Sequence, residues 1–301
     1  MLLLWKLARS VQVGDLCDDF EFLVSDTSST KFVVEGCSKR TALLCFLGVT
    51  RFKFDAVGIN ECEVSPVSEN LVELPDRQKH PFRNMEEDLL LLYRNPYPSS
   101  IIFRHYNWRV PCWTCGYSQK FSEVKEVTGG NESTIFRRAT GGGIVPHWKD
   151  WTFTLVVGPK HPAFTNHPRN FYDMVHKAIL DVLADLGETA TLHECEQDVC
   201  NGAPPTECFQ SPVLSDVLNA KTGAKLAGAA IKKTKEGVLL QGSVQKADLP
   251  RIDWITFKAQ LTKKLTISFN SKAEKKEWPF TSEDHYLPYG ERIHCEAWLN
   301  A

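Results

Sequence analysis

The sequence predicts an α/β fold, in which helices pack against a β-sheet. The clearest helix covers residues 171–186, where apolar side chains recur at i, i+3, i+4, i+7 and i+8 and form one continuous stripe. Residues 151–157 alternate bulky and small side chains and end in an apolar run, which is typical of a strand that is at least half buried. Residues 101–104 and 112–117 predict two further strands.

The first 82 residues differ from the rest of the chain, because they contain no motif that indicates a catalytic or binding function. Short runs rich in Phe and Val, separated by polar breaks, predict short strands there. Pro66, Pro75 and Pro81 then mark a linker. Since 301 residues can hold a medium domain plus a small one, we expect an N-terminal extension over residues 1–82 and a main domain over residues 83–301.

The first helix of the main domain is predicted from its capping residues. Asn84 is a favourable N-cap for a helix over residues 85–94, with acidic residues in its first turn. Pro96 and Pro98 stop that helix. We interpret residues 123–131 as a connection between elements.

Similar signals place the later helices. Pro168 leads into the long helix, and Gly187 is expected at its C′ position, where a left-handed backbone favours glycine. Asp253 is expected to cap a helix over residues 254–263. Residues 286–290 predict a final turn before a short terminal strand.

Charge and hydropathy exclude several classes of protein. The formal net charge is -2, so no global basic field favours nucleic acid or an anionic membrane. Lys6 and Arg9 interrupt the apolar start of the chain, and no run approaches the roughly 18–20 apolar residues that span a bilayer. We therefore expect a cytoplasmic protein with no nucleic-acid and no membrane partner.

The ten cysteines are scattered, which favours free thiols over a disulfide framework. Cys112 and Cys115 form the only C-x-x-C pair, and a zinc site needs two further ligands. His193, Cys195 and Cys200 could supply them on paper. We favour two small residues on a buried strand and predict no metal.

The stretch with the strongest chemical character covers residues 137–147. Arg137 and Arg138 precede three consecutive glycines, and an apolar pair, a proline and His147 follow. Glycines let a ligand approach the backbone N–H groups, and arginine can pair with a carboxylate or a phosphate. The stretch therefore predicts a turn that cradles an anion or an acyl group. A second block of small residues follows at residues 223–230, with Gln241-Gly242-Ser243 beyond it.

These blocks, in this order, resemble the lipoate ligase and octanoyltransferase family, which shares its catalytic domain with biotin protein ligases. The family pattern is Arg-Arg-x-Ser/Thr-Gly-Gly-Gly-x-Val-x-His, then Gly-x-Lys-x-x-Gly-x-Ala, then Gly-Ser/Thr. Tyr106, Trp108 and Pro111 match its usual wording as well. The resemblance covers residues 83 to 301 and implies a mixed central sheet with flanking helices, as in class II synthetases.

The resemblance also implies the site. Lys225 occupies the slot of the family's lysine, which contacts the acyl carbonyl, and His147 takes a positioning role against the acyl pocket. The substrate-binding residues that it implies are Arg138, Thr140, Gly141, Gly142, Gly143, Ile144, Val145, His147, Gly228 and Ala229.

Cys208 decides between two chemistries. Its Cys-Phe-x-x-Pro wording is similar to the cysteine-dependent octanoyltransferases of the family. The resemblance then implies that octanoyl passes from acyl carrier protein to Cys208. From there it passes to a lysine of a lipoyl domain or of the glycine-cleavage H protein, without a cofactor. A nearby ammonium such as that of Lys225 lowers a thiol's pKa, so catalytic roles for both residues are chemically consistent.

Two alternatives stay open. An ATP-dependent lipoate ligase would use ATP and Mg to form a lipoyl adenylate, and Cys208 would be incidental. A non-catalytic homologue would bind acyl groups or lipoyl domains. Ligases commonly continue His-Asp-x-Gly-Asn, whereas this chain has Trp148-Lys149-Asp150-Trp151 after His147, which weakens the ligase alternative.

Overall fold

The computed structural model describes residues 23–24, 32–34, 60–62, 70–194 and 212–286. The chain divides into two compact units, Met1–Ser68 and Glu69–Ala301. In the first unit, β1 (Leu23–Val24), β2 (Phe32–Val34) and β3 (Asn60–Cys62) form an antiparallel sheet. The second unit begins earlier in the chain than the boundary that we expected at residue 83.

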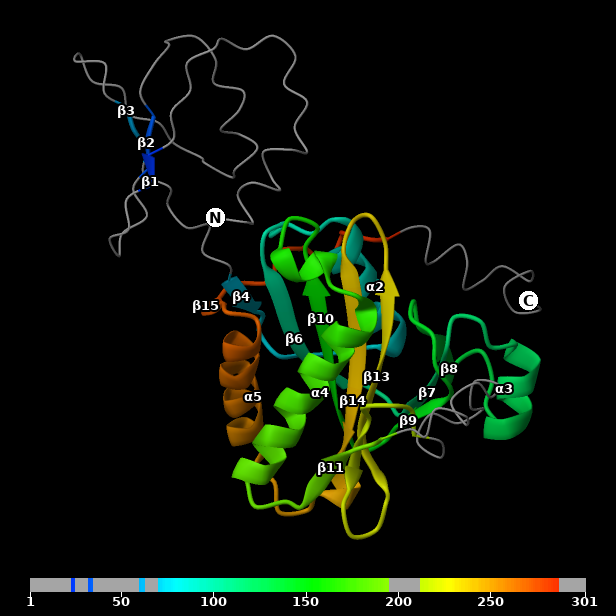
Figure 1. Cartoon of the computed structure of the whole chain (residues 1–301). Helices are drawn as coiled ribbons and strands as arrows, with labels where there is room; N and C mark the ends of the chain where they lie inside the picture. The colour runs from blue at the N-terminus through cyan, green and yellow to red at the C-terminus, as the bar shows by residue number, and fades with distance from the viewer. Residues whose placement is uncertain (1–22, 25–31, 35–59, 63–69, 195–211, 287–301) are drawn as a thin grey trace. The chain divides into compact units, whose positions relative to one another are not determined.

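The second unit is built on a nine-stranded mixed sheet, in the order β11-β12-β13-β14-β10-β6-β4-β15 with β5 paired to β6 (Figure 1). The pairs that include β4 or β5 are parallel and the others are antiparallel, so the predicted mixed central sheet is confirmed. The strands are β4 (Asn70–Glu73), β5 (Arg77–Lys79), β6 (Ile101–Trp108), β10 (Asp150–Val157), β11 (Ala190–Leu192), β12 (Val217–Asn219), β13 (Lys225–Lys233), β14 (Val238–Gln245) and β15 (Lys272–Lys275).

Helices cover both faces of this sheet. The two long helices, α4 (Pro168–Asp185) and α5 (Trp254–Ser268), lie together on one face, and α2 (Pro81–Tyr93) lies on the other (Figure 1). Alternation along β10 divides its side chains between two cores: Phe153 and Leu155 join the core with α4 and α5, and Val156 joins the smaller core with α2. All of β10 is buried, so the predicted strand is confirmed.

The predicted C-terminal end of α4 and the predicted N-terminal cap of α5 are also confirmed. Gly187 follows α4 with a φ of 86°, a left-handed conformation that glycine adopts at no steric cost. The carboxylate of Asp253 accepts hydrogen bonds from the backbone N–H groups of Ile255 and Thr256 at the start of α5. The helix continues to Ser268, beyond the predicted end at residue 263.

Two predictions about local structure are wrong. Asn84 is not an N-cap, because α2 begins at Pro81, whose missing N–H and fixed φ suit the first helical position. Asn84 lies buried within the helix, where its side-chain amide donates to the carbonyls of Lys79 and Asn107. Residues 121–128 form a helix, α3 (Phe121–Thr128), instead of lying in a connection.

A small second sheet lies beside the large one, in the order β8-β7-β9 (Figure 1). It consists of β7 (Cys112–Cys115), β8 (Ile135–Arg137) and β9 (Val145–His147), and α3 precedes β8. Cys112 and Cys115 are buried free thiols on β7, which confirms the strand interpretation of this pair. Within the described ranges no group of three His, Cys, Asp or Glu side chains is placed to hold a metal.

No helix among the described residues is long and apolar enough to cross a bilayer. The turn and terminal strand that we expected after residue 286 fall almost entirely in residues 287–301, outside the described part of the chain.

Candidate active site

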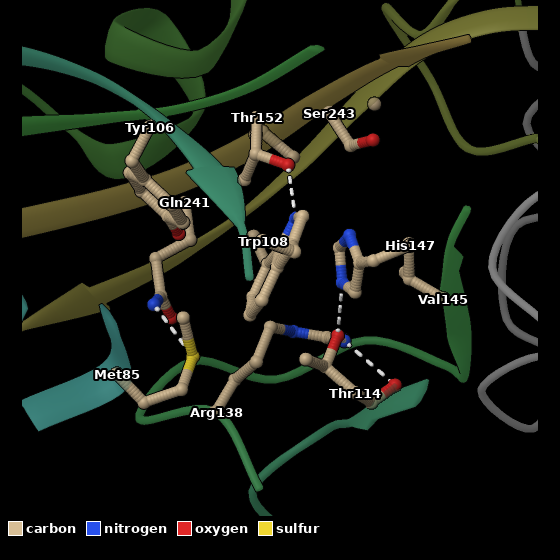
Figure 2. A pocket seen from close by; sticks show the side chains of 14 residues that line it. Met85, Tyr106, Trp108, Thr114, Arg138, Val145, His147, Thr152, Gln241 and Ser243 are labelled. Atoms are coloured by element: carbon tan, nitrogen blue, oxygen red, sulfur yellow. Dashed lines mark hydrogen bonds between the residues drawn. The ribbon is translucent and has the colours of Figure 1, made fainter. Parts of the chain in front are cut away.

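The candidate site is a small cavity on the α2 face of the large sheet. Strand register places Gly228, Ser243, Thr152 and Tyr106 side by side across β13, β14, β10 and β6. Further residues of β6, β13 and β14 complete the sheet side of the cavity, and the others come from α2, from β7 and β9 of the small sheet, and from Arg138 directly after β8. The loop glycines Gly141, Gly142 and Gly143, which we expected to bind substrate, are not in the lining. The full lining is Met85, Tyr106, Trp108, Thr114, Arg138, Val145, His147, Thr152, Gly228, Ala229, Ala230, Gln241, Gly242 and Ser243 (Figure 2).

The free volume of this cavity is about 30 Å³, which is room for one or two water molecules. Its walls are largely apolar. An acyl chain of several carbons therefore fits only if lining side chains move. Met85 can do so most easily, because an unbranched thioether side chain adapts its shape to a ligand.

The glycine loop is folded around the guanidinium group of Arg138. Arg138 donates to the carbonyls of Gly141 (3.1 Å) and Gly143 (2.7 Å), and it also donates to the carbonyl and the hydroxyl of Thr114 on β7. Gly142 has a φ of 87°, so glycine is required there. We expected Arg138 to bind substrate, and in the structure its guanidinium lines the cavity while it organises the loop.

Arg137 lies on the other side of the loop, away from the cavity lining. Its guanidinium donates to the carbonyls of Gly116, Tyr117 and Gln119 and so ties β8 to the turn after β7. Gly116 also lies against the backbone of the glycine loop, because a Cβ at that position would lie 1.9 Å from the carbonyl oxygen of Gly142. An anion at either arginine would compete with backbone carbonyls for these donors.

His147 is held from three sides. Its Nδ1 lies 2.8 Å from Oδ2 of Asp150. Its Nε2 lies 2.7 Å from the hydroxyl of Thr114, and its ring lies against Trp108 at 4.1 Å between centroids (Figure 2). The positioning role that we expected for His147 is consistent with these contacts, and Asp150 and Thr114 are partners that we did not anticipate.

Asp150 is the acceptor at the centre of this network. Its Oδ2 also receives hydrogen bonds from the hydroxyls of Thr152 and Ser243, each at 2.7 Å. Burial alone would raise the pKa of Asp150. The attraction of His147 and the three hydrogen bonds outweigh burial and hold this pKa below its usual value. Asp150 is therefore an ionised carboxylate at neutral pH, directly behind the cavity wall.

Three of the expected binding residues occupy different places around the loop. Val145 lines the cavity. Ile144 packs into the small core formed by Cys115, Phe121 and their neighbours, so it is not in the lining. The hydroxyl of Thr140 donates to Gln241 at 2.9 Å.

A buried cluster of charged side chains joins α2 to the large sheet next to the cavity. The carboxylate of Asp88 receives hydrogen bonds from Arg104 (2.7 Å), Gln241 (2.7 Å) and Thr154 (2.9 Å), and Arg104 also pairs with Glu87 at 2.9 Å. Burial raises the pKa of Asp88, against the opposing effect of these partners. We expected these acids in the first turn of a helix, and because α2 begins at Pro81 they lie in its second turn. Their burial depends on partners far apart in the sequence, chiefly Arg104 and Gln241, which no local pattern reveals.

Lys225 is buried at the start of β13. Its Nζ lies 2.7 Å from Oδ2 of Asp216, and the two side chains are 2% and 0% exposed. A Cβ on Gly228 would lie 2.4 Å from Cε and 2.7 Å from Nζ of Lys225, so the end of the lysine side chain packs directly on Gly228. Gly228 and Ala229 both line the cavity. The ammonium of Lys225 does not line the cavity itself, but it packs on a residue that does, Gly228.

Cys208 lies outside the described residues. Asp216 follows it by eight residues, so the chain allows a separation of at most about 28 Å between their Cα atoms. A contact between Cys208 and Lys225 stays a prediction.

Fold and site together define an α/β catalytic domain with an apolar cavity, a loop of three glycines and a buried lysine beside it. Residues 80–273 match the family model of the lipoyl protein ligase A/B catalytic domain. The chain belongs to this family and is an enzyme.

Two relatives that are similar in sequence are octanoyltransferases. Octanoyltransferase LipM of Bacillus cereus is 29% identical over 196 residues, which cover 62% of this chain and 70% of the relative. Octanoyltransferase LipM of Staphylococcus epidermidis is 27% identical over 205 residues, which cover 65% and 74%.

Two solved structures share the fold. Lipoate-protein ligase A bound with ATP has a TM-score of 0.56 at 17% identity, over 77% of this chain and 98% of that one. The bi-partite lipoate protein ligase of Thermoplasma acidophilum, solved in a study with its E2 lipoyl domain, has a TM-score of 0.56 at 16% identity, over 77% and 96%. Both predictions of family and fold are confirmed.

Proposed function

We propose that this enzyme transfers an octanoyl group in protein lipoylation, with Cys208 as the nucleophile and Lys225 as the group that contacts the acyl carbonyl. The observation that carries this proposal is the buried ammonium of Lys225, which packs on Gly228 at the wall of an apolar cavity. The sequence relatives named octanoyltransferase point in the same direction.

The reaction has two steps. The thiolate of Cys208 attacks the thioester of octanoyl–acyl carrier protein, a new thioester forms, and the carrier thiolate leaves. The amine of the acceptor lysine then attacks the octanoyl–Cys208 thioester, the amide bond forms, and the Cys208 thiol is released as the amine loses its proton. In both steps negative charge develops on the acyl oxygen, where a fixed ammonium stabilises the transition state more than the ground state.

The acceptor is a lysine of a lipoyl domain or of the glycine-cleavage H protein. A ligase with the same fold has been studied with an E2 lipoyl domain, which supports an acceptor of this class. The donor is acyl carrier protein, and the transfer needs no cofactor, because a thioester is already an activated acyl group.

The alternative is ligation of free lipoate with ATP and Mg, since the fold is shared with an ATP-bound ligase. The described residues fit Mg poorly. Beside Lys225 the available carboxylate is that of Asp216, and its two oxygens already accept from Tyr172, Lys225 and the backbone N–H of Val213. A hard cation that prefers octahedral oxygen ligands would have to displace these partners.

Intact-mass measurement separates the possibilities. After incubation with octanoyl–acyl carrier protein and no ATP, we expect the enzyme to gain one octanoyl mass. The adduct should be sensitive to hydroxylamine, as a thioester is, and absent in Cys208→Ala. Acyl transfer by Cys208→Ala that requires ATP and free lipoate would establish the ligase.

A further inference from the structure

The carboxylate of Asp216 is completely enclosed by donors from three parts of the chain. Its Oδ2 lies 2.7 Å from Nζ of Lys225 and 2.6 Å from the backbone nitrogen of Val213. Its Oδ1 receives the hydroxyl proton of Tyr172 at 2.5 Å. Asp216 is 0% exposed, so each of these contacts replaces a hydrogen bond to water.

Tyr172 connects this carboxylate to the cavity wall. Its hydroxyl donates to Asp216 and accepts from the backbone N–H of Ala229 at 3.2 Å. Strand β12 pairs with β13 only as far as Ala227, so among the described residues no strand accepts from the N–H of Ala229 on that side. Tyr172 supplies the missing acceptor from helix α4, and it thereby fixes Asp216 relative to the residues that line the cavity.

The backbone before Asp216 is held in an uncommon conformation. Ser215 has a φ of 69°, which lies in the left-handed region that non-glycine residues seldom adopt. Hydrogen bonds between Ser215 and His193, and between His193 and Asp216, hold this turn in place. Strain of this kind persists where the surrounding structure requires one particular side-chain direction, which here is toward Lys225.

We propose that Asp216 and Tyr172 are positioning residues, which clamp the ammonium of Lys225 against Gly228 for the acyl-transfer reaction. Lysine has four rotatable side-chain bonds and would otherwise sample many positions. The clamp holds one of them, with Oδ2 of Asp216 on the ammonium and the hydroxyl of Tyr172 on Oδ1. Both residues act through Lys225. The proposal rests on the proposed function of this site.

The first test uses Tyr172→Phe, which removes one hydroxyl and retains the ring. We expect the single-turnover rate of octanoyl-thioester formation on Cys208 to fall about tenfold, because a hydrogen bond to a charged group is lost. The concentration of octanoyl–acyl carrier protein that gives half-saturation should stay within twofold. Tyr97→Phe, away from the cavity, is the matched control. A purely structural role would lower the melting temperature and leave the rate, measured well below it, unchanged.

The second test does not depend on acyl transfer. The full chain is treated with N-acetoxysuccinimide, and the initial rate of acetylation of Lys225 is measured by peptide mass spectrometry against that of Lys235, which is an exposed lysine in the same molecule. In wild type Lys225 should react far more slowly than Lys235. In Asp216→Asn and in Tyr172→Phe the ratio should rise at least fivefold, because the amine is released from the clamp. If Asp216→Asn does not fold, the acetylation ratio in Tyr172→Phe alone tests the clamp.

The two tests separate the two proposals. A wild-type enzyme that forms no octanoyl adduct contradicts the proposed function, while the acetylation ratio still reports on the clamp. An adduct in wild type together with unchanged ratios and rates in both variants overturns the clamp. A raised ratio with an unchanged rate also overturns it, because the clamp would then hold the amine without serving the reaction.

Discussion

Replacing Gly228 by alanine should cripple the enzyme by displacing the ammonium of Lys225. The added Cβ would lie 2.4 Å from Cε and 2.7 Å from Nζ of Lys225, and 3.1 Å from Oδ1 of Asp216. Ordinary van der Waals contact begins at 3.4 Å, so the end of the lysine side chain must move by about 1 Å. A movement of that size away from Gly228 also disturbs the bond of 2.7 Å to Asp216.

The expected cost follows from this displacement. A misplacement of about 1 Å costs on the order of 100-fold in rate, which corresponds to about 2.7 kcal/mol of transition-state stabilisation. The overpacked strand should lose about 1–3 kcal/mol of folding stability. The enzyme therefore stays folded at 25 °C and loses most of its activity.

The assay is single-turnover octanoyl transfer, combined with a double-mutant cycle. Lys233→Ala, at the exposed end of the same strand, is the control and should keep its rate within twofold. Since Gly228→Ala acts through Lys225, it should cost little in the background of Lys225→Met. Full activity in Gly228→Ala, or an equal loss in both backgrounds, would refute this reasoning.

Three further predictions concern charge and domain structure. Lys225→Ala should lower octanoyl transfer at least 100-fold, and Lys225→Arg should not restore it, because a planar guanidinium does not fit the space of an ammonium. The pKa of Asp150 is held low, so its stabilising effect is full above the unfolded value of about 3.9 and disappears as pH falls through the lower folded value. Asp150→Asn should therefore cost about 2 kcal/mol at pH 7 and flatten the acid limb of a pH-dependent unfolding curve followed by circular dichroism. A chain lacking residues 1–68 should keep its transfer activity, whereas one lacking residues 1–80 should be insoluble on expression, because β4 pairs with both β6 and β15.

Local patterns in the sequence predicted those elements whose cause is local. The stripe of α4, the cap at Asp253 and the buried strand β10 all depend on side chains a few residues apart. Helix α3 was not predicted, because it buries only Phe121 and Val124. Two apolar residues are too few to show a helical period in the sequence.

The contacts that build the site come from residues far apart in the sequence. Asn84 looked like an N-cap because its amide favours that position, yet this amide donates to the carbonyls of Lys79 and Asn107 on two other elements. Lys225 was identified through the family resemblance, because it occupies the position of the lysine in the family pattern. Its partner Asp216 escaped notice, because it reaches Lys225 through the irregular pairing of β12 with β13, and no spacing rule predicts a register shift.

The charge on the Lys225 side of the cavity bears on which substrate the enzyme takes. An ion pair of Lys225 with Asp216 has little net charge, so it attracts the carboxylate of a free fatty acid only weakly, whereas a thioester carries no charge there to be compensated. Asp216→Asn should leave the ammonium uncompensated and lower the dissociation constant of octanoate about tenfold, with that of neutral octanamide unchanged. Isothermal titration calorimetry of the two ligands against wild type and variant measures this directly. An equal change for both ligands would show that the pairing of Lys225 with Asp216 has no part in selecting a neutral acyl donor.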